Sequence, residues 1–253
     1  MRDTAIQVFE GVFNEEFCEM VMKLFESETK VDTMKITDNG KTIKSSIDLN
    51  IPFGNHPELD SYTHKEKWVE IFQHFADAVG ECMQLYNERI QGEQLDKLCP
   101  STNQYILNNL YLPRKITTPV IQKYSSGDYH SWHTDYRPGH EKLLSLIFYL
   151  NDVDEDAGGT TEFANNVHVR PKMGKVVVYP ADHRTLHQFN PLTHGEKYIV
   201  RMFTVHDYIN DNEKQLELER DELRLERDEL RSERDELRSE LDELQERLNE
   251  KKV

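Results

Sequence analysis

The sequence has 253 residues, of which 37% are hydrophobic, and a formal net charge of −16 at pH 7. This length accommodates one sizeable domain with an appendage, or two small domains. The negative charge argues against general binding to nucleic acids or to anionic membranes, because both attract basic surfaces. Three scattered cysteines indicate neither a disulfide framework nor a zinc knuckle. Since no apolar run is long enough for a signal peptide or a bilayer span, we expect a cytoplasmic protein.

The first hundred residues predict two helices on either side of a polar segment. Residues 5–13 favour a strand that leads into a helix, with Asn14 as its N-cap. A second helix is predicted over about residues 65–91, and we interpret it as a scaffold helix that packs against a sheet. Its apolar residues recur on one face: Trp68, Ile71, Phe72, Phe75, Ala76, Val79, Met83 and Tyr86. Residues 31–63 between the helices predict a long, partly stranded excursion outside the packed core, either a lid or a surface insertion.

From about residue 118 the chain alternates short β-branched and aromatic runs with turns. This spacing is typical of an antiparallel sandwich or barrel. The turn at Gly158 and Gly159 is most simply explained by a need for positive φ. The predicted strands are 118–125, 129–136, 143–150, 160–163, 167–170, 175–179, 184–188 and 197–206.

The composition changes abruptly near Asn210, after which ERDELR recurs every seven residues. Leucines one heptad apart occupy the d positions, whereas three of the five a positions are arginine, which weakens the seam. Glutamates at g and arginines at e favour parallel, in-register chains. We therefore predict a homo-oligomeric parallel coiled coil, dimer or trimer, over 209–253. The alternative is a solitary charged helix held by Asp–Arg pairs three residues apart, such as Asp221 with Arg224.

One pattern in the strand-rich region points to a metal. His133 and Asp135 are two residues apart, so on a strand both side chains face the same side. His187 lies on another predicted strand, and Lys197 opens the strand that follows. Two imidazoles and one carboxylate suit Fe(II), and they leave three coordination positions for a bidentate co-substrate and O₂. A lone His-x-Asp is weak evidence in a chain with eleven histidines, and His183 is a rival for the distal ligand.

Taken in order, the motifs of this region resemble those of the prolyl 4-hydroxylase-like 2-oxoglutarate/Fe(II) dioxygenases. The resemblance runs from the N-terminal strand and helix to about residue 207 and excludes the heptad tail. The matching motifs are Tyr124-x-x-Gly127, His133-x-Asp135, Tyr149-Leu-Asn-Asp152, Gly158-Gly-x-Thr161-x-Phe163, Pro171-x-x-Gly174 and His187-x-x-x-Pro191-x-x-x-Gly195-x-Lys197.

This resemblance implies the fold, the cofactors and the roles of six residues. The fold would be mostly β with α: a double-stranded β-helix (jelly-roll) core over about 118–207 flanked by N-terminal helices, in a domain of residues 1–208. His133, Asp135 and His187 would bind Fe(II). Lys197 would pair with the distal carboxylate of 2-oxoglutarate, assisted by the hydroxyls of Tyr124 and Thr161. O₂ would be the second co-substrate, and ascorbate (vitamin C) a reductant.

The chain departs from the family at positions where substrate would approach. His130 stands where many members carry a tyrosine, Lys142 where an arginine is usual, and Phe203 where a tryptophan is frequent. Together with Trp132 these form the predicted substrate set.

The leading hypothesis is hydroxylation of a peptidyl proline, as in procollagen-proline 4-dioxygenase. A free amino acid or another small molecule is the alternative substrate. A non-catalytic binding module with an oligomerising tail is a competing hypothesis of a different class.

Overall fold

The computed structural model describes residues 5–38, 40–54, 56–94, 115–136 and 142–205, together with Arg234. All of these except Arg234 belong to the first of the chain's two units, residues 1–206. The predicted coiled coil therefore lies outside the described residues apart from that one arginine. No helix in the described part of the chain combines the length and apolar character needed to cross a membrane.

Twelve strands form one antiparallel sheet, and all eight strands predicted after residue 118 are confirmed. The order along the sheet is β1-β10-β7-β12-β5-β3-β6-β11-β8-β9, with β2 paired to β3 and β4 to β12. The strands are β1 (Gln7–Phe9), β2 (Asp32–Asp38), β3 (Lys41–Asn50), β4 (Lys115–Ile116), β5 (Val120–Tyr124), β6 (His130–His133), β7 (Lys142–Tyr149), β8 (Thr161–Phe163), β9 (His168–Val169), β10 (Val176–Pro180), β11 (His187–Phe189) and β12 (Lys197–Val205).

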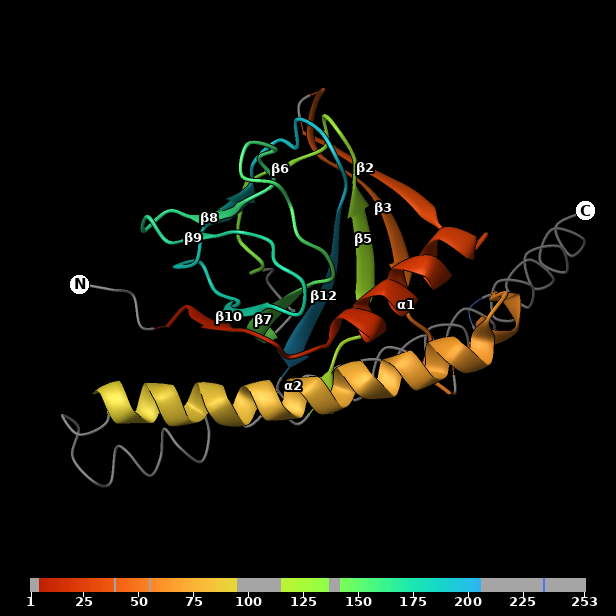
Figure 1. Ribbon diagram of the computed structural model, residues 1–253, viewed down its shortest axis with the longest axis horizontal. Coiled ribbons are helices and arrows are strands. Elements are labelled where there is room, and N and C mark those ends of the chain that lie inside the picture. Colours follow the sequence, from red (N-terminus) through yellow and green to blue (C-terminus); the bar gives the residue numbers. More distant parts are fainter. Residues whose placement is uncertain are drawn as a thin grey trace, which may run out of the picture. The chain divides into compact units, whose positions relative to one another are not determined.

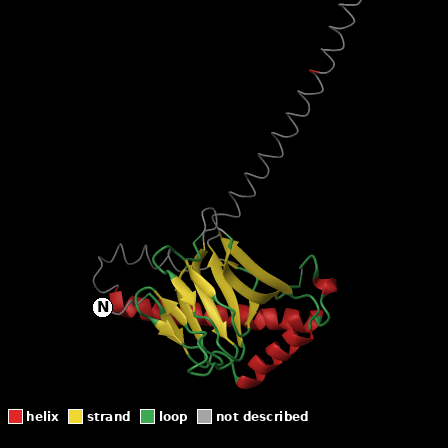
Figure 2. Ribbon diagram, turned by 90° about the horizontal axis from the view of Figure 1, so that it is seen from above, coloured by secondary structure: helices red, strands yellow, loops and turns green. Residues whose placement is uncertain are grey.

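The two predicted helices are confirmed as α1 (Glu15–Ser27) and α2 (Lys65–Gln94), and a short 3₁₀ turn, η1, spans Leu59–Ser61. The side chain of Asn14 caps α1 by accepting a hydrogen bond of 2.9 Å from the Phe17 amide. Both helices cover the same face of the sheet (Figures 1 and 2). The apolar stripe of α2, with Trp68 and Phe75 fully buried, packs there against alternate residues of β7, β10 and β12.

The sheet curls so that strands from opposite ends of its order meet. The ring centroids of Phe163 on β8 and Tyr179 on β10 lie 4.9 Å apart, although these strands are far apart in the pairing order. A second apolar cluster fills the inside of the curl and contains Tyr124, Ile147 and Ile199. A sheet that encloses its own core in this way is consistent with a jelly roll.

Strand β3 corrects the prediction for residues 31–63. It pairs with β5 and β6, so it lies within the sheet and is not an excursion outside the core. Its alternate residues Lys44, Ser46 and Asp48 are buried. Because these buried residues are polar, the strand shows no apolar alternation in the sequence, and its burial could not be inferred from the hydrophobic pattern.

Candidate metal centre

The predicted metal ligands lie on neighbouring strands. β6 pairs with β11 so that His133 is directly opposite His187, and Asp135 follows two residues after His133. One potential ligand atom from each of the three side chains lies within 4.8 Å of the other two. His187 is 1% exposed and Asp135 is 7% exposed, so the cluster sits inside the curl. The rival His183 is exposed, and the register selects His187.

Backbone carbonyls orient both imidazoles. The Nδ1 atom of His133 lies 2.7 Å from the Ser131 carbonyl oxygen, and that of His187 lies 2.9 Å from the Thr185 carbonyl oxygen. A proton on Nδ1 donates to each carbonyl, which leaves Nε2 as the free lone pair for a metal. Burial, reinforced by His187, lowers the pKa of His133 to about 4, so this imidazole is neutral and competent as a ligand at neutral pH.

The carboxylate of Asp135 is held by two hydroxyl groups. Oδ2 accepts hydrogen bonds from Ser145 Oγ at 2.7 Å and from the Tyr179 hydroxyl at 3.0 Å. Burial alone would raise the pKa of Asp135, but His187 and the Ser145 hydrogen bond outweigh it and lower that pKa. The group is therefore an anion at neutral pH. The same Tyr179 hydroxyl lies 3.1 Å from Nε2 of His187, so it adjoins two of the three ligands.

These residues fit iron. The donor set is two imidazoles and one carboxylate, each oriented by an outer hydrogen bond, and this set suits Fe(II) with open positions. Ser145 and Tyr179 escaped the sequence reasoning. The alternation of side chains along β7 and β10 could have identified them, because it places both residues on the inner face with Ile147 and Val177.

Lys197, the predicted partner of the 2-oxoglutarate carboxylate, is a buried cation without a buried anion. It is 1% exposed, and its Nζ donates to the Gly159 carbonyl at 2.9 Å. The same atom lies 3.9 Å from the ring centre of Phe189 and 4.9 Å from that of Tyr124. No carboxylate among the described residues forms an ion pair with it, and burial lowers its pKa to about 7. An anionic ligand would supply the missing charge.

The other two predicted co-substrate residues line the same space. Tyr124 is paired with Lys197 across β5 and β12. Thr161 is paired with Phe189 across β8 and β11, and its hydroxyl lies 2.7 Å from that of Tyr149. Gly159 reaches Lys197 because residues 158 and 159 have φ of 78° and 67°, as expected for this turn. The structure therefore brings Tyr124, Thr161 and Lys197 together beside the triad.

Three of the four predicted substrate residues adjoin the triad. The ring of His130 stacks on that of His133 with centroids 3.5 Å apart. Lys142 Nζ lies 3.7 Å from the ring centre of Phe203 and donates to the Asp135 carbonyl at 3.4 Å. Trp132 is different, since it is 46% exposed and, as the neighbour of His133 on β6, lies on the outer face of the sheet.

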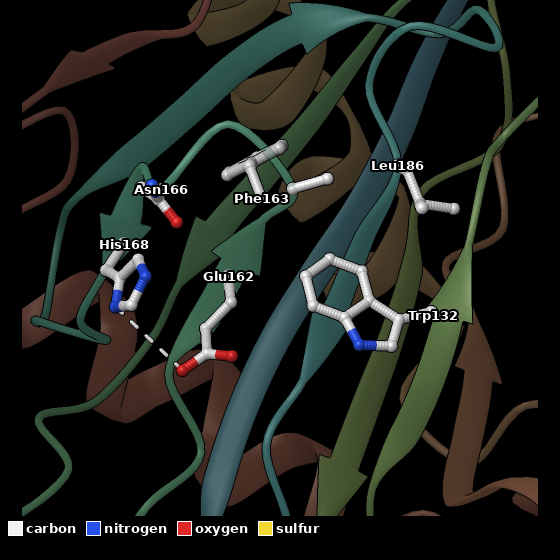
Figure 3. Close-up of a pocket in the computed structure, with 7 residues that line it drawn as sticks. Trp132, Glu162, Phe163, Asn166, His168 and Leu186 are labelled. Carbon is white, nitrogen blue, oxygen red and sulfur yellow. Dashed lines mark ion pairs between the residues drawn. The ribbon is translucent and has the colours of Figure 1, made fainter.

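Trp132 instead lines an external pocket with a volume of about 490 Å³. Figure 3 shows Trp132 and Leu186 at one end of this pocket and His168 and Asn166 at the other. Glu162, between the two ends, has Oε1 3.9 Å from Nδ1 of His168. The pocket is thus apolar at one end and polar at the other, and Trp132 and Leu186, which line it, are the chain neighbours of His133 and His187.

A buried polar network on the inner face also went unpredicted. Asp48 pairs with Lys44 Nζ at 3.0 Å and accepts from Gln122 Nε2 at 2.7 Å. Gln122 in turn accepts from the Tyr124 hydroxyl at 3.3 Å, which links the network to the Lys197 site. Arg201 on β12 lies on the same face, with its guanidinium 4.9 Å from the ring centre of Phe203.

Comparisons with known proteins agree on one family. Residues 119–205 match the model of the 2OG-Fe(II) oxygenase superfamily. A PKHD-type hydroxylase of Pseudomonas fluorescens is 24% identical over 222 residues, which cover 83% of each chain. A PKHD-type hydroxylase of Synechococcus sp. is 28% identical over 104 residues, or 39% of this chain and 46% of that relative. The matched region thus spans about half of the Synechococcus relative and most of the Pseudomonas one.

Solved structures share the fold. A prolyl hydroxylase of Trichoplax adhaerens, solved with a peptide fragment of the hypoxia-inducible factor oxygen degradation domain, aligns with a TM-score of 0.58 at 14% identity, over 80% of this chain and 84% of that one. A prolyl-4-hydroxylase of Pseudomonas putida aligns with a TM-score of 0.52 at 14% identity, over 80% and 93%. With the triad that fits iron, these matches confirm the predicted resemblance to the prolyl 4-hydroxylase-like 2-oxoglutarate/Fe(II) oxygenases, which is carried by residues 119–205.

Proposed function

We propose that the protein uses Fe(II), 2-oxoglutarate and O₂ to hydroxylate a prolyl residue of a peptide or protein. The observation that carries this proposal is the convergence of two features inside one curl. The triad of His133, Asp135 and His187 offers three ligand atoms within 4.8 Å of one another, and the buried cation Lys197 lacks a described anionic partner. One site can thus hold a metal and a dianionic co-substrate.

The residues have separate tasks in this reaction. His133, Asp135 and His187 would hold Fe(II), which in this family couples oxidative decarboxylation of 2-oxoglutarate to insertion of one oxygen atom into a substrate C–H bond. Lys197, with the nearby hydroxyls of Tyr124 and Thr161, would hold the distal carboxylate. The enclosed apolar cluster around Phe163 and Ile199 excludes water from the reacting groups. The reaction consumes a C–H bond, O₂ and 2-oxoglutarate, and it yields C–OH, succinate and CO₂; ascorbate would keep the iron reduced.

The peptide or protein substrate is supported by the fold and by an exposed apolar surface of the same domain. The Trichoplax neighbour was solved with a peptide fragment. In this chain, the external pocket has the exposed side chains of Trp132 and Leu186, 46% and 38% exposed, at one end. An exposed apolar surface is typical of a site that binds a peptide or protein rather than a small polar molecule.

The test is oxygen transfer by the purified full-length chain. We expect succinate release from 2-oxoglutarate with Fe(II), and a mass gain of one oxygen on proline, when the enzyme is mixed with proline-containing peptides from a cell lysate. His133→Ala should abolish both signals. Hydroxylation of free amino acids with no modified peptide would favour the small-molecule alternative, and iron binding without any turnover would reject the enzyme.

We further propose that residues 209–253 form a parallel homo-oligomeric coiled coil. The heptad leucines and the complementary charges at e and g support it. Light scattering on the full chain and on a version that ends at Asp211 would test this. An oligomer that becomes monomeric on truncation is expected, and two monomers would reject the proposal in favour of a solitary helix.

A further inference from the structure

Arg201 is a cation inside the curl that the proposed reaction does not use. It lies on β12 between Ile199 and Phe203, opposite Ile147 of β7 and Val120 of β5. Ile147 and Ile199 belong to the inner apolar cluster, and the guanidinium stacks over Phe203 at 4.9 Å, so this side chain shares their face. The residue as a whole is partly exposed.

The guanidinium lacks the partners that a buried arginine normally has. Its Nε atom is buried and has no hydrogen-bond acceptor, and no carboxylate of the described residues forms an ion pair with it. Arg170 differs in one respect: its Nη1 is likewise buried without a hydrogen bond, but that atom lies 3.2 Å from Glu155 Oε1 and so has a carboxylate beside it. A hydrogen-bond donor that is shielded from water without an acceptor, as Nε is here, lowers the free energy of unfolding. Binding of a ligand that accepts a hydrogen bond from the guanidinium would therefore be favourable.

The balance of charges on the inner face indicates the charge of a ligand that the site could bind. Lys44, Lys197 and Arg201 are cations, and Asp48 and Asp135 are anions; Lys44 already pairs with Asp48 at 3.0 Å. Fe(II) and the dianion 2-oxoglutarate cancel one another, with Lys197 facing the co-substrate. The loaded site therefore keeps one uncompensated positive charge, that of Arg201. A further anion would balance the site.

Arg201 is also near the metal centre. Phe203 is directly opposite Ser145, and Arg201 is directly opposite Ile147, so Arg201 is a diagonal neighbour of Ser145 across the strand pair. Ser145 donates to Asp135 Oδ2 at 2.7 Å. An anion held by Arg201 would consequently lie close to the position where a substrate C–H bond must approach the iron.

We propose that Arg201 forms an anion-binding subsite for the primary substrate, and that this substrate is an acidic peptide with a carboxylate directly beside the target proline. This rests on the proposed prolyl hydroxylation. The planar guanidinium can bind a carboxylate through two parallel hydrogen bonds, which gives both affinity and a fixed orientation. Fixed orientation of the neighbouring carboxylate would select which proline carbon faces the metal.

The experiment uses two matched pairs of synthetic peptides with a single proline. One pair has Glu or Gln directly before the proline, and the other has Glu or Gln directly after it. Affinity is measured by calorimetry on the holoenzyme with Fe(II) and 2-oxoglutarate in the absence of O₂, and oxygen transfer by mass spectrometry in air. The first variant, Arg201→Gln, removes the charge. The second, Arg201→Lys, keeps the charge but cannot form two parallel hydrogen bonds. Arg170→Gln is the control at another arginine.

We expect wild type to bind the Glu peptide of at least one pair about 10- to 100-fold more tightly than its Gln partner, as for a charge-assisted contact. Arg201→Gln should lose this preference, Arg201→Lys should keep part of it, and Arg170→Gln should keep all of it. The affinity for 2-oxoglutarate should be unchanged in Arg201→Gln.

Three results would overturn the proposed subsite. In the first, the wild-type protein binds the Glu and Gln peptides equally; in the second, the preference for Glu survives in Arg201→Gln. In the third, Arg201→Gln loses affinity for 2-oxoglutarate alone, which would mean that Arg201 binds the co-substrate. Failure of the proposed function would give a different result: succinate would form, but no prolyl peptide would bind or gain oxygen in any variant. The proposal of an acidic peptide substrate would then be rejected as well.

Discussion

The two faces of strand β12 have different roles: one packs against the helices, and the other faces the inside of the curl. Its even-numbered residues Tyr198, Val200 and Met202 are buried against the helices in an apolar cluster. Its odd-numbered residues face the inside of the curl, where Lys197 and Arg201 carry charges among apolar groups. Because side chains alternate along a strand, one nine-residue segment contributes to the stability of the domain and to its chemistry. Substitutions on the two faces should therefore have separable effects.

The difference has an energetic reason. Burial of apolar surface against α1 and α2 stabilises the fold by about 25 cal/mol per Å². The charged groups inside the curl oppose folding unless they are paired, and Lys197 and Arg201 have no described carboxylate partner. These cations thus lower the stability of the ligand-free protein, and ligands that bring anions should restore it.

The largest effect is expected for His133→Ala on the inner face. Loss of one of three ligands should reduce iron affinity and turnover by more than about 100-fold, since even an outer partner of a metal ligand is worth 10- to 100-fold. The melting temperature of the metal-free protein should change little, because the helix-covered core is untouched. Iron content and succinate release measure the effect, and His168→Ala, which removes an exposed imidazole, is the control. Equal iron binding by both variants would contradict the assignment of the ligand.

Phe75→Ala tests the opposite face. Phe75 is fully buried on α2, and its ring centroid lies 5.4 Å from that of Phe148 on β7. The cavity should lower the free energy of unfolding by about 3–5 kcal/mol. At a temperature where the variant is folded, its affinity for 2-oxoglutarate should equal that of wild type. Denaturant unfolding measures the change, with Leu85→Ala on the exposed side of α2 as the control. Equal stability losses in both variants would show that α2 does not pack as described.

The pH dependence of 2-oxoglutarate binding tests the unpaired cation on the inner face. Burial lowers the pKa of Lys197 to about 7, and a bound carboxylate would raise it again. Below that pH the amine is already protonated, so affinity should be constant. Above it, binding must take up a proton, and affinity should fall by about tenfold per pH unit. Calorimetry from pH 6 to 9 measures this. Lys197→Met should bind weakly at every pH, and a flat wild-type profile would mean that Lys197 stays charged without its ligand.

The contrast between the faces also explains what the sequence could predict. The residues of the helix-covered face show apolar periodicity in the sequence. For this reason both helices and the strands after residue 118 were predicted, with α2 at about 65–91 against the observed Lys65–Gln94. The ligands His133, Asp135 and His187 were found because their spacing matches a family motif, and the structure places them together.

The inner residues that no motif records escaped prediction. Lys44 and Asp48 are polar and lie in the segment predicted to be outside the core, and Gln122 is a polar residue of a predicted strand, although each is at most 7% exposed. Their burial depends on mutual hydrogen bonds that form only when β3 pairs with β5. Arg201 shows the same limit, because a charged residue in a strand is usually exposed and only the curl of the sheet turns this one inward.

The smallest predicted effect lies at the start of α1, on the apolar side of the molecule. Asn14 Oδ1 accepts from the Phe17 amide at 2.9 Å, and this satisfies one of the amides that have no partner within the helix. Asn14→Ala should lower the free energy of unfolding by about 1 kcal/mol, and Asn14→Asp should keep or slightly raise it, because an anion at this end also favours the helix dipole. Turnover should be unaffected in both variants, since α1 contacts the face of the sheet opposite the metal centre. A change in turnover without a change in stability would mean that the two faces are coupled, and the division of labour along β12 would then be wrong.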